Sequence, residues 1–242
     1  MGIVATGASS GAEATGASGR SAETSGASIL VVCTGNVCRS PYLEYLLRDR
    51  LDQVWGSRRM TVRSAGVRGL VGEPMTGASA GLLKAEGIDS ADFRARRVSP
   101  QDLKGADLVI CATRAHRSAV VQLVPALLRR AVLLPELALA HGHLPEPPAV
   151  SCDSSVRGAD GAEVTEDDLS SWLRCAARAV VTRRPTIVTA VPPDELDIDD
   201  PYGGTEEAYD RMRRQIERWL PDAVAAISPT TDAEQIPARR GR

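Results

Sequence analysis

The stretch VVCTGNVCRSP at residues 31–41 decides the fold, because it joins an apolar run to the start of a helix. The run SILVV at 28–32 has the length and composition of a buried strand. Ser40 and Pro41 are typical of a helix start, with serine as N-cap and proline at the first helical position. Cys33 is therefore expected at the end of a strand, in a short loop before a helix.

This loop has the residues that an oxyanion site needs. Backbone N–H groups in a tight curl, together with the N-terminus of the next helix, attract a tetrahedral anion. Arg39 can bind two oxygens of that anion in parallel. Gly35 permits the tight turn, and Asn36 tolerates a left-handed conformation while its side chain bonds the loop. The sequence therefore predicts that the loop binds phosphate.

Cys33 is predicted to be a nucleophile. The positive potential of the loop favours its thiolate form, which is the reactive form of cysteine. A thiolate facing a bound phosphoryl group can displace the leaving oxygen and form a cysteinyl-phosphate, which water then hydrolyses. The reaction needs no cofactor.

A metal site is the weaker interpretation of Cys33 and Cys38. The three histidines, His116, His141 and His143, form no paired pattern that would complete a zinc site. Two ordinary buried thiols would explain the cysteines, but not the glycine, asparagine, arginine and Ser-Pro around them. No metal is predicted.

A phosphate monoester needs its leaving oxygen protonated, so an acid must lie near the anion site. The segment DELDIDDPYGG at 194–204 offers five carboxylates before a proline turn. Asp-Pro pairs initiate turns in many proteins, so the pair alone does not identify the acid.

The loop C-T-G-N-V-C-R-S-P resembles the active-site signature of the low-molecular-weight protein tyrosine phosphatases. Further landmarks of that family follow in order: SAG at 64–66, GEP at 72–74, ADLVICATRAHR at 106–117 and DPYGG at 200–204. The likeness covers about residues 28–140 and 197–222. It implies a four-stranded parallel sheet and a phosphorylated protein as substrate.

The resemblance also implies roles by position. Cys33 would be the nucleophile, Arg39 the phosphate clamp and Asp200, directly before proline, the general acid. Ser40 would stabilise the leaving thiolate, while Asn36 and Ser64 would brace the loop. The residues expected around the phosphate are Thr34, Gly35, Asn36, Val37, Cys38 and Ser40.

Phosphotyrosine is the predicted substrate, with phosphoarginine as the alternative. In the family the phosphotyrosine ring lies between aromatic walls, and Tyr202 can supply one of them. On the opposite loop, Gly69 and Leu70 stand where a tryptophan is usual. Related phosphoarginine enzymes carry threonine at the position of Val37, and valine has no hydroxyl to assist attack on a phosphoramidate.

Two other classes stay open. A thiol-linked arsenate reductase has a similar loop but needs two further cysteines in a relay, and Cys111, Cys152 and Cys175 form no close pair after the third strand; Pro41 also fits the phosphatases better. A silent anion-binding module would keep the loop without turnover.

Cys38 has two possible roles. It could trap an oxidised Cys33 as a disulfide and so protect it from irreversible oxidation. Alternatively, it is a small residue packed under the loop.

Strand-like and helix-like runs alternate along the chain, which favours one α/β domain with a parallel sheet flanked by helices on both faces. Strands are predicted at 28–32, 60–64, 107–112 and 131–134. Four helices are predicted in the domain. The first begins at Ser40 and buries Leu43, Leu46, Leu47 and Leu51, and the second contains Leu82 and Leu83 and ends at Gly87. The third contains Val120, Val121 and Val124, and the last begins at Thr205 and buries Tyr209, Met212, Ile216 and Trp219.

The domain is expected at 28–228, with residues 141–199 as an insertion. In it, Thr165 and Asp168 fit a capping box for a helix before Pro185, whose apolar side is Leu169, Trp172, Leu173, Ala176 and Val180. Residues 1–27 are mostly Gly, Ala, Ser and Thr and are predicted to be a disordered leader. Residues 229–242 are predicted to be a flexible tail.

The totals exclude several classes of partner. The chain has 242 residues, 43% of them apolar, and a net charge of −2, so neither nucleic acid nor an anionic membrane is expected to bind. The start lacks the pattern of a secretory signal, and no apolar run spans a bilayer. The five cysteines suit reduced thiols in a cytoplasmic protein.

Overall fold

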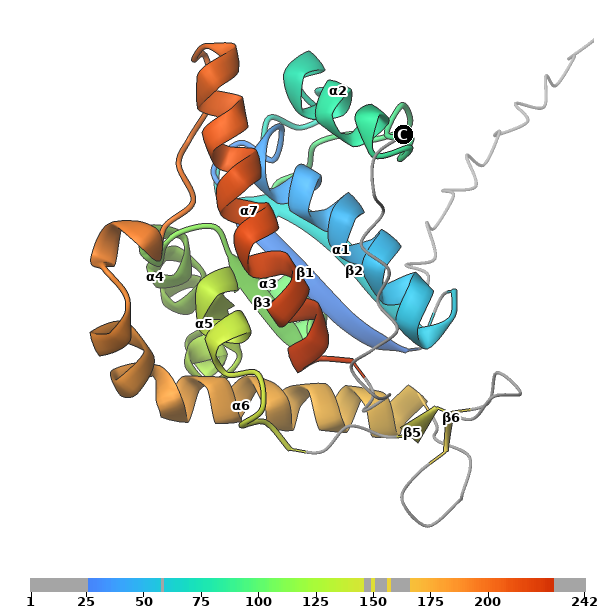
Figure 1. The fold of residues 1–242 in the computed structure, drawn as a ribbon, viewed down its shortest axis with the longest axis vertical. Helices are drawn as coiled ribbons and strands as arrows, with labels where there is room; N and C mark the ends of the chain where they lie inside the picture. Colours follow the sequence, from blue (N-terminus) through green and yellow to red (C-terminus); the bar gives the residue numbers. More distant parts are fainter. Residues whose placement is uncertain (1–25, 58, 146–148, 151–155, 158–165, 229–242) are drawn as a thin grey trace, which may run out of the picture.

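The computed structural model describes residues 26–57, 59–145, 149–150, 156–157 and 166–228. Its centre is a four-stranded parallel sheet with the strand order β2-β1-β3-β4 (Figure 1). The strands are β1 (Ala27–Cys33), β2 (Met60–Gly66), β3 (Leu108–Cys111) and β4 (Ala131–Leu133). They coincide with the four predicted strands, so the α/β fold class is confirmed.

Strand β1 lies inside the sheet, between β2 and β3. Its residues from Ile29 to Val32 are at most 3% exposed. Parallel strands are covered on both faces by helices, so their sequences are continuously apolar instead of alternating. The run SILVV has this property, and it brings Cys33 to the carboxyl edge of the sheet.

Helices cover both faces of this sheet (Figure 1). On one face lie α1 (Arg39–Trp55), α5 (Leu134–Leu139) and α7 (Glu206–Ala226), and on the other lie α3 (Pro100–Gly105) and α4 (Arg114–Leu123). α2 (Gly77–Ala85) packs on α1 and α7. The apolar positions predicted for α1 and α7 are all buried: Leu43, Leu46, Leu47, Leu51, Tyr209, Met212, Ile216 and Trp219.

The predicted start of α1 is wrong. The helix begins at Arg39, Cys38 is the residue before it, and Ser40 lies in the first turn and does not cap it. The physical reason is that the Ser40 hydroxyl bonds the Cys33 sulfur and the Asn36 amide. A side chain used inside the loop cannot also bond the helix N-terminus.

The helix of the insertion is longer than predicted. α6 spans Glu166–Ala190 and continues through Pro185. Thr165 of the predicted capping box lies outside the described residues. Proline inside a helix removes one hydrogen bond and costs about 3 kcal/mol. Ile187 and Val191 are buried beyond it, so packing continues past the proline and offsets this cost.

Several short elements were not predicted. They are the helices α3 and α5, the 3-10 turns η1 (Pro125–Arg129) and η2 (Pro193–Glu195), and a two-stranded antiparallel ribbon of β5 (Ala149–Val150) and β6 (Val156–Arg157). α3 had a sequence signal, because Ser99 and Asp102 form a capping box. The other elements are too short for a hydrophobic period to identify them.

Polar contacts fix α6 to the domain. Arg184 places its Nε 2.8 Å from Glu136 Oε1 and donates from Nη2 to the Ala131 carbonyl. Glu136 is fully buried and also pairs with Arg117, at 2.5 Å. Further along α6, Arg174 and Ser170 bond Asp107 near the start of β3. The insertion is thus joined to the sheet by buried carboxylates.

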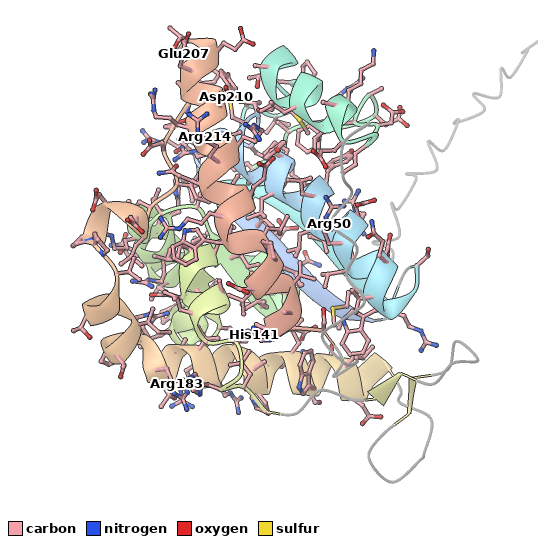
Figure 2. All side chains as sticks on the ribbon, in the orientation of Figure 1. Arg50, His141, Arg183, Glu207, Asp210 and Arg214 are labelled. Atoms are coloured by element: carbon pink, nitrogen blue, oxygen red, sulfur yellow. The ribbon has the colours of Figure 1, made fainter. Side chains whose placement is uncertain are left out.

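We expect Arg184→Met to lower the free energy of unfolding by about 1–3 kcal/mol, because it leaves Glu136 with one cation fewer. Arg183→Met is the matched control, since Arg183 is exposed on the outer side of α6 (Figure 2), and should change stability by less than about 0.5 kcal/mol. Urea denaturation measures both. Equal values for the two variants would show that the Glu136 contact does not hold α6.

Candidate active site

The loop from Cys33 to Cys38 has its carbonyl groups turned outward. The carbonyls of Cys33, Thr34 and Gly35 accept hydrogen bonds of 2.9 Å from the N–H groups of Val67, Arg68 and Leu70, and the Val37 carbonyl accepts one of 2.8 Å from Thr76. A peptide unit whose oxygen faces one way presents its N–H the other way. The loop N–H groups are therefore expected on the opposite side, which is the arrangement that an oxyanion cradle needs.

The backbone conformation of Asn36 and the missing side chains of Gly66 and Gly69 make this arrangement possible. Asn36 adopts the left-handed conformation that was predicted, with φ of 59°. Gly66, at the end of β2, lies against the loop so closely that a Cβ there would be 2.4 Å from the Thr34 carbonyl oxygen. Gly69 is equally confined, because a Cβ there would be 2.2 Å from the Arg96 carbonyl oxygen.

The Cys33 sulfur lies at the base of the cradle. It is 2.9 Å from the Ser40 hydroxyl and accepts a 3.4 Å hydrogen bond from the Asn36 N–H. Cys33 is 2% exposed and is a free thiol.

Asn36 ties the loop to its surroundings. Its amide nitrogen donates to the hydroxyls of Ser40, at 3.0 Å, and Ser64, at 2.7 Å, and its oxygen accepts from the Arg96 N–H. Ser64 in turn donates to Glu44, a buried carboxyl that sequence reasoning missed. Burial raises the pKa of Glu44, although hydrogen bonds from Ser64 and contact with Arg48 oppose this effect.

Arg39 is also buried, at the rim of this loop. Its Nη1 donates to the Ile198 carbonyl at 3.2 Å, and its Nη2 contacts Thr34 Oγ1 at 3.3 Å and Asp200 Oδ2 at 2.7 Å. Its Nε is buried and has no hydrogen-bond partner within the described ranges. An unsatisfied buried donor costs about 1–3 kcal/mol, so donation from this nitrogen to an acceptor would be favourable.

Asp200 stands where the loop opens to solvent, and its side chain is 51% exposed. The segment before it is held to the domain, because the Ile198 N–H donates to the Ala112 carbonyl at 2.8 Å. The neighbouring carboxylates have other partners. Asp197 accepts from the N–H and guanidinium of Arg114, and Asp199 forms a 3.8 Å ion pair with Arg211 of α7.

The geometry just described has counterparts in known proteins. The family model of the low molecular weight phosphotyrosine protein phosphatases matches residues 28–157 of this chain. The chain belongs to this family.

Individual relatives agree with the family match. The chain is 34% identical over 127 residues to the low molecular weight protein-tyrosine-phosphatase Etp of Escherichia coli K12, which covers 52% of this chain and 81% of Etp. The tyrosine phosphatase AmsI of Erwinia amylovora has the same fold, with a TM-score of 0.54, 20% identity and coverage of 83% of this chain and 93% of AmsI. The YwlE arginine phosphatase of Geobacillus stearothermophilus also has this fold, with a TM-score of 0.52, 24% identity and coverage of 82% of this chain and 90% of YwlE.

The family match ends before Asp200, so the structure adds information on the acid loop. Residues 161 positions apart meet there, since Asp200 Oδ2 lies 2.7 Å from Arg39 Nη2. The residues expected to form the walls of the substrate pocket lie on the surface. Tyr202, two residues after Asp200, is 61% exposed, and Leu70 is 39% exposed. Val71, next to Leu70, is a further exposed apolar side chain.

His116 is a site residue that sequence reasoning missed. It lies in the first turn of α4, is 6% exposed, and has its Nε2 2.8 Å from Thr34 Oγ1 in the phosphate loop. Its Nδ1 is 2.7 Å from Thr113 Oγ1, which also caps α4. The Thr113 to His116 spacing after the third strand was the available signal, but histidine was considered only as a metal ligand.

The remaining cysteines do not form a relay with Cys33 in the described part of the chain. Cys38 contacts Tyr209 Oη at 3.5 Å and Thr76 Oγ1 at 3.6 Å, and burial raises its pKa. Burial likewise raises the pKa of Cys111 to about 12, and Cys175 is exposed on α6. Cys152 lies outside the described residues, and the protective role of Cys38 stays a prediction.

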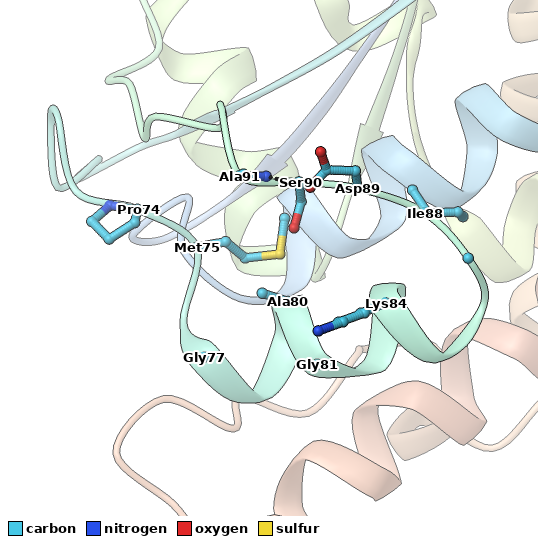
Figure 3. Close-up of a pocket in the computed structure, with 11 residues that line it drawn as sticks. Pro74, Met75, Gly77, Ala80, Gly81, Lys84, Ile88, Asp89, Ser90 and Ala91 are labelled. Carbon is cyan, nitrogen blue, oxygen red and sulfur yellow. Dashed lines mark hydrogen bonds between the residues drawn. The ribbon is translucent and has the colours of Figure 1, made fainter.

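Among the described residues, no group of three or more His, Cys, Asp or Glu side chains could hold a metal ion, and none of the helices has the length and apolar character of a membrane span. A separate cavity of about 660 Å³ lies beside α2 (Figure 3). Its lining includes Met75, Ala80 and Ile88 with Lys84 as a cation, and none of the predicted site residues.

His116 gives the stability of the protein a specific pH dependence. Burial, and then the charge of Arg39, lower the pKa of His116 to about 4 from 6.5. Between pH 6.5 and 4 the unfolded chain binds a proton that the folded chain does not, so stability falls as pH falls and levels off below pH 4. The effect amounts to about 3 kcal/mol.

We expect His116→Gln to lack this contribution. The difference in unfolding free energy between the variant and the parent protein should shift by about 3 kcal/mol in favour of the variant from pH 7 to pH 4. Urea denaturation at pH 7, 6, 5 and 4 measures this shift. A difference that is constant with pH would mean that His116 titrates alike in both states.

Proposed function

We propose that this chain is a protein-tyrosine phosphatase in which Cys33 carries the phosphoryl group. One observation carries the proposal: the Ser40 hydroxyl lies 2.9 Å from the Cys33 sulfur, the buried Arg39 Nε has no hydrogen-bond partner among the described residues, and neighbouring N–H groups hold the loop carbonyls outward. A dianion with tetrahedral oxygens can accept hydrogen bonds from the loop N–H groups and from Arg39 at once, next to the sulfur that attacks it.

In the first step, the Cys33 thiolate attacks phosphorus and the bond to the leaving oxygen breaks. The loop N–H groups and Arg39 stabilise the charge on the remaining phosphoryl oxygens. Arg39 binds them through Nε and Nη2, and Nη2 must exchange its contact with Asp200 for one with phosphate. Asp200, released from Arg39, takes up a proton from solvent and donates it to the leaving oxygen.

In the second step, water attacks phosphorus and gives its proton to Asp200. The bond between sulfur and phosphorus breaks, inorganic phosphate leaves, and the Ser40 hydroxyl stabilises the returning thiolate at 2.9 Å. Asn36 and Ser64 keep the loop in one shape through both steps, because a cradle that need not reorganise stabilises charge best.

The proposed substrate is a phosphotyrosine side chain of a protein. Tyr202 and Leu70 are exposed on the two loops next to the cradle and offer apolar surface to an aromatic ring. The name of the relative Etp supports the same substrate class. We also propose a cytoplasmic location, because a reaction that depends on a free thiol requires reducing conditions.

The general acid can be tested with leaving groups of different basicity. Asp200→Asn should lower kcat for phenyl phosphate by about 10²–10³-fold, and less for p-nitrophenyl phosphate, whose leaving oxygen needs little protonation. Asp199→Asn is the matched control and should leave both rates within about threefold. Cys33→Ser is the blank. Equal losses with both substrates would contradict proton donation by Asp200.

Val37 tests the choice between phosphotyrosine and phosphoarginine. Val37 is buried in the loop and has no hydroxyl, so Val37→Thr should raise the ratio of phosphoarginine to phosphotyrosine turnover by about tenfold. Steady-state kinetics on peptides with either modification measure the ratio. An unchanged ratio would show that this side chain does not select the substrate.

A further inference from the structure

His116 connects helix α4 to the phosphate loop through a continuous chain of side chains. The chain runs from Arg39 Nη2 to Thr34 Oγ1 at 3.3 Å, from there to His116 Nε2 at 2.8 Å, and from Nδ1 to Thr113 Oγ1 at 2.7 Å. Each side chain except Thr34 is in a regular element or caps one. Thr34 is therefore the one member whose hydroxyl must be oriented by its neighbours.

The direction of the hydrogen bonds follows from charge. Arg39 can only donate, so Thr34 Oγ1 accepts from it and has its own proton to give away. The pKa of His116 is lowered to about 4, so the ring is neutral at physiological pH and has one acceptor nitrogen. The nearby guanidinium favours the lone pair on Nε2. Thr34 then donates to Nε2, and Nδ1–H donates to Thr113.

The contacts of Arg39 show why this matters. Three acceptors hold the guanidinium: the Ile198 carbonyl, Thr34 and Asp200. Asp200 has to leave during catalysis if it is to protonate the leaving oxygen. Thr34 is then the remaining side-chain acceptor for Arg39 among the described residues, and it fixes the plane in which Nε and Nη2 meet the phosphate oxygens.

We propose that His116 is a positioning residue for Arg39, which it orients by holding the Thr34 hydroxyl in one rotamer. This inference rests on the proposed phosphatase function for its effect on rate, but not for its effect on anion binding. A threonine hydroxyl without the histidine can turn among three staggered positions, and only one of them faces the guanidinium. Hydrogen bonds that point in one direction also strengthen one another.

Binding of vanadate, which mimics the phosphoryl group in its transition state, tests the relay. Thr34→Val and His116→Leu should each weaken vanadate binding and lower kcat/KM by about tenfold, a size typical of one lost orienting contact. The double variant should be no more than about threefold worse than either single variant, because both break the same chain. Thr34→Ser and His116→Gln keep the required oxygen or acceptor and should restore part of the affinity.

Controls separate this role from a structural one. His141→Leu removes an exposed histidine and should leave vanadate affinity unchanged. If His116→Leu lowers the free energy of unfolding but leaves vanadate affinity intact, or if the two losses simply multiply in the double variant, the relay is wrong. The nitrogen chemical shifts of His116 should show a neutral ring protonated at Nδ1 from pH 6 to 8. Protonation at Nε2 would overturn the proposed direction.

The proposed phosphatase function and the proposed role of His116 can be disproved independently of each other. If the parent protein binds vanadate but hydrolyses no phosphate ester, the phosphatase assignment fails while vanadate affinities and the histidine spectrum still decide the relay. If the parent turns over phosphotyrosine and the variants at positions 34 and 116 match it in both rate and vanadate affinity, the relay fails and the phosphatase assignment stands.

Discussion

The hydrogen bonds that draw the carbonyls of the phosphate loop outward are the constraint on which the site depends. The segment after β2 supplies the N–H groups of Val67, Arg68 and Leu70 for this purpose. Without them the peptide units could rotate and turn their oxygens toward the phosphate, where they would repel it. The phosphate loop can thus bind an anion because the loop after β2 donates hydrogen bonds to its carbonyl groups.

The parallel sheet makes this pairing possible. β1 and β2 are neighbours that end at the same edge, so the loops that follow them start side by side. β3 ends at that edge as well, and it delivers Thr113 and His116 through the start of α4. The acid loop reaches the same point from the end of α6, and its Ile198 joins both the β3 end and Arg39. Four distant segments meet because three parallel strands stop together.

The sequence predicted the strands and the cradle because their signals are local. The apolar run before Cys33, the left-handed Asn36 and the buried face of α1 each depend on a few neighbouring residues. The Ser40 cap was wrong because that hydroxyl is claimed by Cys33 and Asn36, a contact that loop closure creates. Glu44 and His116 were missed because their contacts with Ser64 and Thr34 join residues far apart in sequence, and the Thr113 to His116 spacing does not by itself point to Thr34. Helix α6 extends past its predicted end at Pro185 because packing beyond this proline outweighs the lost hydrogen bond.

The close approach of Gly66 to the loop has a consequence for how this protein can vary. Its hydrogen atom occupies the space in which any side chain would strike the Thr34 carbonyl oxygen, and Gly69 is confined in the same way against Arg96. Neither glycine carries a reactive atom. In a saturation library selected for phosphatase activity, both positions should nevertheless be as intolerant of replacement as the nucleophile itself, so intolerance alone would misidentify them as part of the chemistry.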